Sequence, residues 1–330
     1  MKVRMQLSKI KFALGMDTKI EYLDNYRAYI PEPFDSVIIF QADFELAWAW
    51  RFSKNTVDGC KYAENIGLME RNNVPLILDL CEKYAIPVTW ATVGHLFLKS
   101  CSKINGVAHP EIKRLNKLEN RFWKFTGDDW FNCDPCSDYL KSPAWYCPDL
   151  IELIQTSKVS HEIGCHTFSH IDCRDDVCAP EILETELTEC KRLASQIGVE
   201  LKSFVHPAHT IGNLKTLKKS GFTNFRTNYH DILGYPKLHP EGIWELKSTA
   251  DLYWREGWSA DYHIYRYRRI IDRAIKHKSV CVFWFHPSLD RRFVDKVLPE
   301  IFRYLQDKNI HISTSGKYSD FLEKVHLHES

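Results

Sequence analysis

Two pairs of polar residues in this chain have the types and spacing that metal chemistry requires. Asp43 and Glu45 are separated by one residue, and His166 and His170 by three. Two imidazoles and one carboxylate form a common zinc donor set in hydrolytic sites, where a fourth position stays open. The spacing is weak evidence by itself, because a chain with 15 histidines contains roughly one such pair by chance. The pairs become candidate ligands only if the fold brings them together.

Three further histidines belong to the same hypothesis. His286 follows an apolar run and precedes a proline, and His206 and His209 flank Pro207-Ala208. An imidazole exchanges protons near neutral pH, so each can act as an acid, a base or a ligand. Taken singly, His286 is better explained as a core histidine, and the other two are explained equally well as loop residues beside a polar pocket.

The elements that must position these residues are short apolar runs that alternate with helical segments. The predicted strands span residues 37–40, 87–93, 161–166, 204–205, 222–227, 280–285 and 310–313. The predicted helices span residues 75–84, 148–156, 180–197, 213–220, 261–277 and 291–306, followed by a terminal helix. The first of these helices is expected to begin at Pro75, since proline suits a first helical turn.

Alternating strands and helices predict a parallel sheet covered by helices, and about seven strands favour a β/α barrel. We expect one barrel domain over residues 35–330, with a lead-in over 1–34 and an insertion over about 101–147. Chemistry in such barrels lies at the carboxyl ends of the strands. The candidate residues follow predicted strands, so they should converge on that face.

Composition excludes several kinds of partner. The chain has 330 residues and a formal net charge of +1, which argues against a bulk electrostatic partner such as nucleic acid or an anionic membrane. No apolar run of signal-peptide length follows the basic residues within positions 1–20, and no stretch of 18 apolar residues occurs. We therefore expect a cytoplasmic protein without a transmembrane segment. The basic and aromatic stretch 265–269 is interpreted as a solvated helix face.

The 11 cysteines are an odd number and many stand in apolar runs, as small buried residues do in a reducing compartment. Cys133 and Cys136 form a CxxC pair. Because a zinc knuckle usually needs a second such pair, a structural zinc ion is not expected there.

Taken in order along the chain, three segments resemble the polysaccharide deacetylase family, of the NodB-homology, carbohydrate esterase 4 type. They are VIIFQADFELAWAW (37–50), WYCPDLIELIQTSKVSHEIGCHTFSHID (145–172) and FWFHP (283–287). Residues 203–227 share the outline of a further family segment, so the resemblance covers roughly residues 35–320. The DFELAW form looks like a subgroup found among surface-polysaccharide biosynthesis proteins.

The resemblance implies a distorted (β/α)7 barrel and a bound divalent metal, usually zinc. By position, Asp43 matches the general base and His286 the general acid. Glu45, His166 and His170 match the metal ligands. The exchanged assignment of Asp43 and Glu45 stays open, since Asp is the commoner ligand.

One departure concerns the arginine that orients the base carboxylate in this family, because no arginine stands near Pro207. His206 and His209 occupy that region and are candidates for contact with the carboxylate or the substrate. Trp48 and Trp145 are predicted to stack on a sugar, although core packing explains them equally well.

The implied reaction is removal of an N-acetyl or N-formyl group from an amino sugar in surface polysaccharide biosynthesis. The sugar would be nucleotide-linked, lipid-linked or part of a glycan. Two alternatives remain open: a catalytically lapsed carbohydrate-binding relative, which the departure at Pro207 suggests, and an amidohydrolase on a non-sugar amide such as a ureide.

Overall fold

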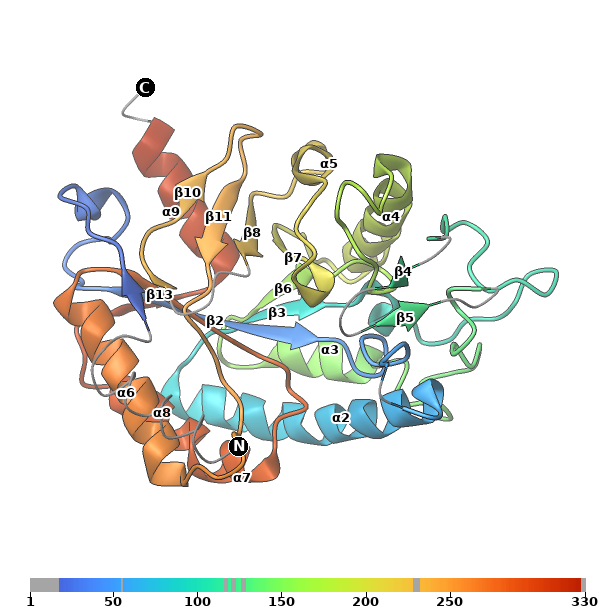
Figure 1. Cartoon of the computed structure of the whole chain (residues 1–330), viewed down its shortest axis with the longest axis horizontal. Helices are drawn as coiled ribbons and strands as arrows, with labels where there is room; N and C mark the ends of the chain where they lie inside the picture. The colour runs from blue at the N-terminus through green and yellow to red at the C-terminus, as the bar shows by residue number, and fades with distance from the viewer. Residues whose placement is uncertain are drawn as a thin grey trace.

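A curved sheet of parallel strands forms the centre of the molecule (Figure 1). The computed structural model describes residues 18–327, apart from residues 55, 116–117, 120–122, 126–128 and 228–231. Neighbouring parallel strands run in the order β11 (Trp244–Lys247), β8 (Asn224–Thr227), β7 (Ser203–Val205), β6 (Glu162–Cys165), β3 (Thr89–Thr92), β2 (Val37–Phe44) and β13 (Val280–Phe285). The predicted distorted barrel is confirmed.

Short strands complete the edges of this sheet. β14 (His311–Ser313) pairs with the first half of β2, and β12 (Ala250–Asp251) pairs with β13. β10 (Lys237–Leu238) runs antiparallel to β11. β1 (Lys19–Ile20) and β9 (Ile232–Leu233) form a separate two-stranded parallel sheet. Within the described residues no backbone ladder joins β11 to β13, so the barrel stays open along this line.

β2 is buried along its whole length, which explains its nearly continuous apolar sequence. Side chains alternate between the two faces of a strand. Val37 and Ile39 join an apolar cluster that includes residues of β11 and β13, whereas Ile38 and Phe40 join the larger core beneath the helices. By this alternation Asp43 belongs to the face of Val37 and Ile39.

The helices cover the sheet (Figure 1). They are α2 (Gly59–Tyr84), α3 (Pro148–Thr156), α4 (Pro180–Gln196), α5 (Leu214–Lys219), α6 (Ala260–Lys276), α7 (Arg291–Lys296), α8 (Leu298–Leu305) and α9 (Ser315–Leu327). The described residues also form three short 3-10 helices: η1 (Tyr26–Ala28) before α2, η2 (Gly94–Phe97) between α2 and α3, and η3 (Pro207–His209) between α4 and α5.

Two helix predictions are wrong in their boundaries. The first helix begins at Gly59 and contains Pro75 in its interior, because Asp58 caps it by accepting a hydrogen bond from the Lys61 amide. The predicted helix 291–306 divides into α7 and α8 at Val297, shortly before Pro299.

The insertion is mostly irregular and folds onto the barrel. It contains the short antiparallel pair β4 (Leu118–Glu119) and β5 (Lys124–Phe125), and it buries large aromatic side chains such as Trp130 and Phe131. A disulfide between Cys60 and Cys133 joins it to the start of α2, and these two cysteines depart from the interpretation of the cysteines as buried residues of a reducing compartment. The other nine are free thiols.

The described part of the lead-in, residues 18–34, also packs on the barrel, and Ile30 is fully buried there. Residues 1–17 lie outside the described residues. Among the described helices, none has the length and apolar character needed to cross a membrane.

Candidate functional site

The carboxyl ends of β2, β6 and β13 bring the predicted ligands together. One oxygen of Glu45, Oε1, lies 2.7 Å from Nε2 of His166 and 3.1 Å from Nε2 of His170. The other oxygen, Oε2, lies 3.5 Å from Nε2 of His286. Glu45, His166 and His170 form one candidate metal group, and Asp43, Glu45 and His286 form an overlapping one.

The loop after β6 places the two histidines side by side without a helical turn. Thr167 and His170 both have left-handed backbones, with φ of 58° and 57°. The buried carboxylate of Glu186 fixes the loop by accepting hydrogen bonds from the amide and the hydroxyl of Ser169. A spacing of four residues would place two histidines on one face of a helical turn, but here the loop conformation brings the two rings together.

The donor set fits a cation. Nδ1 of His166 lies 2.7 Å from the Val205 carbonyl oxygen, which can only accept, so the proton of the neutral ring belongs on Nδ1. Nε2 then presents a lone pair to Oε1 of Glu45, so two acceptors face each other, and a cation between them would bind both. In addition, Oε2 of Glu45 is buried without a hydrogen-bond partner in the described residues. A histidine whose other ring nitrogen donates to a carbonyl oxygen is the usual form of a metal-ligating histidine.

The protonation states suit the same role. Burial lowers the pKa of His170 to about 4 and outweighs the opposing effect of Glu45, so the ring is neutral at pH 7. Burial would raise the pKa of Glu45, but His286 and His170 hold it well below its usual value. A neutral imidazole and an ionised carboxylate are the forms that ligate metals.

Asp43 is held by an arginine that sequence reasoning missed. Nη1 and Nη2 of Arg226 lie 2.7 and 2.6 Å from the two carboxylate oxygens of Asp43, and both side chains are buried. Burial would raise the pKa of Asp43, but Arg226 holds it below its usual value. Arg226 comes from β8, a different segment from Pro207. Its only sequence signal is a charged residue inside a predicted strand.

The turn after β2 is supported by α2. Oε1 of the buried Glu70 accepts hydrogen bonds from the amides of Glu45 and Leu46. Burial and the nearby Glu45 raise the pKa of Glu70 well above its usual value. Gly67 lets the helix approach closely, because a Cβ there would lie 2.8 Å from the Ala47 amide nitrogen.

A pocket of about 400 Å³ opens over these residues. It is lined by Asp43, Glu45, Ala49, Trp50, Ser53, Lys54, Thr56, Tyr62, Trp123, His170, Ala208, His209 and His286. Three of them are aromatic and lie around the polar centre, which suits a ligand with both polar and apolar faces.

Three predicted substrate contacts need correction. Trp48 and Trp145 are buried, and the indole nitrogen of Trp48 donates to the Trp145 carbonyl, so neither lines the pocket. Trp50 and Trp123 stand there instead. His206 is also buried, with Nε2 bound to the Gly212 carbonyl, whereas His209 does line the pocket.

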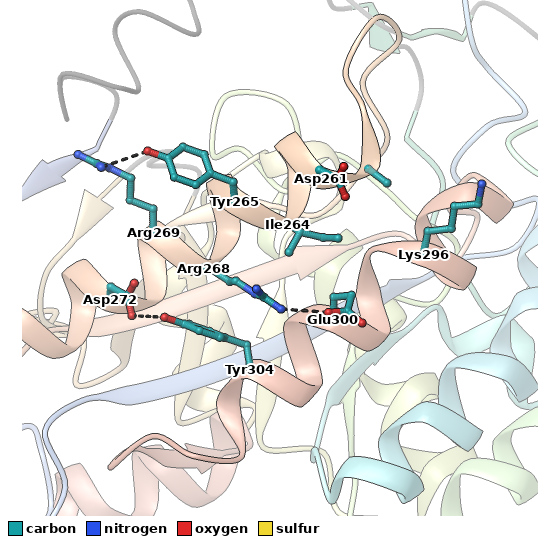
Figure 2. Close-up of a pocket in the computed structure, with 10 residues that line it drawn as sticks. Asp261, Ile264, Tyr265, Arg268, Arg269, Asp272, Lys296, Glu300 and Tyr304 are labelled. Carbon is teal, nitrogen blue, oxygen red and sulfur yellow. Dashed lines mark hydrogen bonds and ion pairs between the residues drawn. The ribbon is translucent and has the colours of Figure 1, made fainter.

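A larger hollow of about 750 Å³ lies along α6 and faces α7 and α8 (Figure 2). It includes much of the basic and aromatic stretch, and some of its charges are paired, since Arg268 binds Glu300 and Asp272 accepts a hydrogen bond from Tyr304. Tyr265 is exposed, whereas Arg266 and Tyr267 are buried. The helix face is therefore only partly solvated, and its paired charges make it a weaker candidate site than the pocket.

Known proteins share the fold at low sequence identity. No family model and no curated protein matches the sequence. Two structures assigned as polysaccharide deacetylases cover 91% of this chain: one from Mycobacterium smegmatis (15% identity, 93% of its length, TM-score 0.62) and one from Pseudomonas aeruginosa PAO1 (12%, 94%, 0.63). PuuE allantoinase is similar as well (13% identity, 91% of this chain, 94% of its own, TM-score 0.60).

Proposed function

We propose that this chain is a zinc-dependent hydrolase that removes an N-acetyl or N-formyl group from an amino sugar. The observation that carries the proposal is the single Glu45 oxygen that faces both His166 and His170, beside an aspartate held by an arginine. Two observations favour a sugar as the substrate: the fold is similar to that of polysaccharide deacetylases, and aromatic side chains line the pocket.

Each residue has a role that its surroundings permit. Glu45, His166 and His170 would hold the metal, which would supply a Lewis acid to polarise the acyl carbonyl. Asp43 is ionised and lines the pocket, so it can accept a proton from the attacking water. His286 is about one-third exposed at the pocket and can donate a proton to the leaving amine.

The exchanged assignment of the two carboxylates is disfavoured by their contacts. Glu45 faces the histidines through one oxygen, while both oxygens of Asp43 are bound to Arg226. A metal bound to Asp43 would have to share those oxygens with a guanidinium.

The alternative of a lapsed enzyme loses its main support. It depended on the absence of an arginine near Pro207, and Arg226 supplies a guanidinium to the base from β8. Hydrolysis of a non-sugar amide remains an outcome to test, since PuuE allantoinase shares the fold.

We further propose that the chain acts in the cytoplasm on a precursor of a surface polysaccharide. The nine free thiols are consistent with a reducing compartment, whereas the Cys60–Cys133 disulfide is not. Fractionation of cells that express the tagged chain would decide this, and recovery outside the cytoplasm would overturn it.

The deciding experiment measures metal content and acyl release together. Wild type, His166→Ala/His170→Ala and the control His277→Ala are assayed for zinc and for acetate or formate released from nucleotide-linked, lipid-linked and polymeric acylated amino sugars, with allantoin as a comparison. We expect the double variant alone to lose one zinc equivalent and all activity. Metal binding without turnover of any sugar would contradict the deacylase assignment, and hydrolysis of allantoin alone would redirect it.

A further inference from the structure

A second convergence of metal-binding side chains lies outside the pocket, where the insertion meets the barrel. His95 lies in η2, just after β3, while Cys101, His109 and Asp134 come from the segment between η2 and α3. Their donor atoms all lie within 4.8 Å of one another. His95, His109 and Asp134 are buried and Cys101 is half-buried.

The distances match those between the ligands of one small cation. Oδ2 of Asp134 lies 3.1 Å from Nε2 of His95, 3.0 Å from Nε2 of His109 and 3.4 Å from Sγ of Cys101. The two Nε2 atoms are 3.1 Å apart. Ligand atoms on tetrahedral zinc stand about 3.3–3.7 Å apart, given metal–ligand bonds of about 2.0–2.3 Å. The group is thus slightly more compact than a loaded site.

The histidine protons indicate that the group is arranged for a cation. Nδ1 of His95 lies 3.2 Å from the Trp145 carbonyl oxygen, and Nδ1 of His109 lies 3.4 Å from a carboxylate oxygen of Glu111. Both partners only accept, so the Nδ1 atoms carry the protons of the neutral rings. In this tautomer the Nε2 lone pairs of both rings point at Oδ2 of Asp134, which is the arrangement of three donors around one shared cation.

Asp134 is also oriented for this task. Its other oxygen, Oδ1, accepts hydrogen bonds from the Tyr146 hydroxyl at 2.8 Å and from the Cys136 amide at 2.9 Å. Outer hydrogen bonds of this kind fix a ligating carboxylate and leave one oxygen for the metal.

We propose that His95, Cys101, His109 and Asp134 bind a structural zinc ion that fastens the insertion to the barrel. Binding releases the thiol proton of Cys101 to solvent. One thiolate and one carboxylate then balance the charge of Zn²⁺, so the buried site is neutral. With four protein ligands the site is closed, as in structural rather than catalytic zinc sites.

The position of this site connects it to the pocket. The ring of Trp48, three residues after Glu45, lies 4.3 Å from that of His95. Trp123, from the same insertion, lies 4.7 Å from the ring of His170 and lines the pocket. Zinc at the second site would therefore help to fix Trp48, which follows the metal ligand Glu45 in the chain, and Trp123, which lines the pocket.

Cobalt distinguishes the two sites, because only the second contains a thiolate. The full-length chain is stripped of metal, loaded with Co²⁺ and examined for the thiolate-to-cobalt charge-transfer band in the near ultraviolet. Zinc content is measured in parallel. Wild type should bind two zinc equivalents and show the band. Cys101→Ser should lose the band and the second equivalent, whereas His166→Ala/His170→Ala should keep the band and lose only the first.

Cys136→Ser is the matched control, since Cys136 lies beside the cluster and ligates nothing in the proposal. It should keep the band and both equivalents. Asp134→Asn should weaken zinc binding at the second site by at least tenfold. Absence of the band in folded wild type overturns the proposal, and so does a Cys101–Cys136 disulfide found by thiol counting. If only the site at Glu45, His166 and His170 fails to bind zinc, the proposal for the second site still stands.

Discussion

Arg226 is the residue that turns the buried Asp43 into a usable carboxylate. It binds both oxygens of Asp43, and its guanidinium also lies 4.7 Å from the centre of the Trp284 ring. A carboxylate buried without this partner would have a raised pKa. Planar, two-point binding is a property of arginine that lysine does not share.

Replacement of Arg226 should therefore change the pH profile as well as the rate. In Arg226→Met the pKa of Asp43 rises, so the acidic limb of kcat/KM moves to higher pH by about 1 unit or more, and the maximum falls by roughly 10²–10³-fold. Arg226→Lys should restore part of the maximal kcat/KM and part of the position of its acidic limb, because the lysine ammonium returns a positive charge to Asp43 but binds only one of its oxygens. A lower rate with an unmoved acidic limb would show that Arg226 is only structural.

At the scale of elements, the turn after β2 depends on how closely α2 approaches it. Glu70 binds the amides of Glu45 and Leu46, and Gly67 leaves room for Ala47 and the Ala144 carbonyl. Leu46 has a left-handed backbone, with φ of 47°, so this turn needs support from its surroundings.

Gly67→Ala should force α2 away from the turn. Its Cβ would lie 2.8 Å from the Ala47 nitrogen and 3.0 Å from the Ala144 oxygen, and such overpacking costs about 1–3 kcal/mol of unfolding free energy. Urea unfolding and zinc affinity should both decline. Asn65→Ala, at an exposed position in the same helix, should leave both intact. If Gly67→Ala matches this control, the close approach does not hold the metal ligands in place.

At the scale of the whole molecule, buried histidines make stability depend on pH. His161 accepts a hydrogen bond at Nδ1 from the Val88 amide, 3.1 Å away, and burial lowers its pKa to about 4. The unfolded chain, with a pKa near 6.5, therefore binds more protons between these values. The stabilisation from neutral His161 is complete above pH 6.5 and is lost as pH falls towards 4.

His161→Asn should flatten this dependence, because Oδ1 of asparagine can accept the same amide hydrogen bond without titrating. In metal-free protein, the loss of unfolding free energy between pH 7.5 and 4.5 should shrink by about 1–3 kcal/mol relative to wild type. Urea unfolding at the two pH values measures it. Equal losses in both proteins would contradict the assigned role of His161.

Much of the architecture could be predicted from local sequence. The apolar run at β13 and the helices α3 and α4 were placed within a residue or two of their observed bounds, because period, proline and glycine signals act within a few residues. The sequence does not predict the strand β11, and the helix it predicts at 75–84 is too short, since a proline in the interior of α2 gives the same local signal as a helix start.

Local apolar runs are enough to show which side chains end the strands, and so to predict that Glu45, His166, His170 and His286 lie on one face of a parallel barrel. The distant groups that face them follow only from the packing of the whole chain. Arg226 meets Asp43 across 183 residues of chain, and Asp134 meets His95 across 39. Such contacts depend on sheet order and on how an irregular insertion packs, and neither leaves a periodic pattern in the chain.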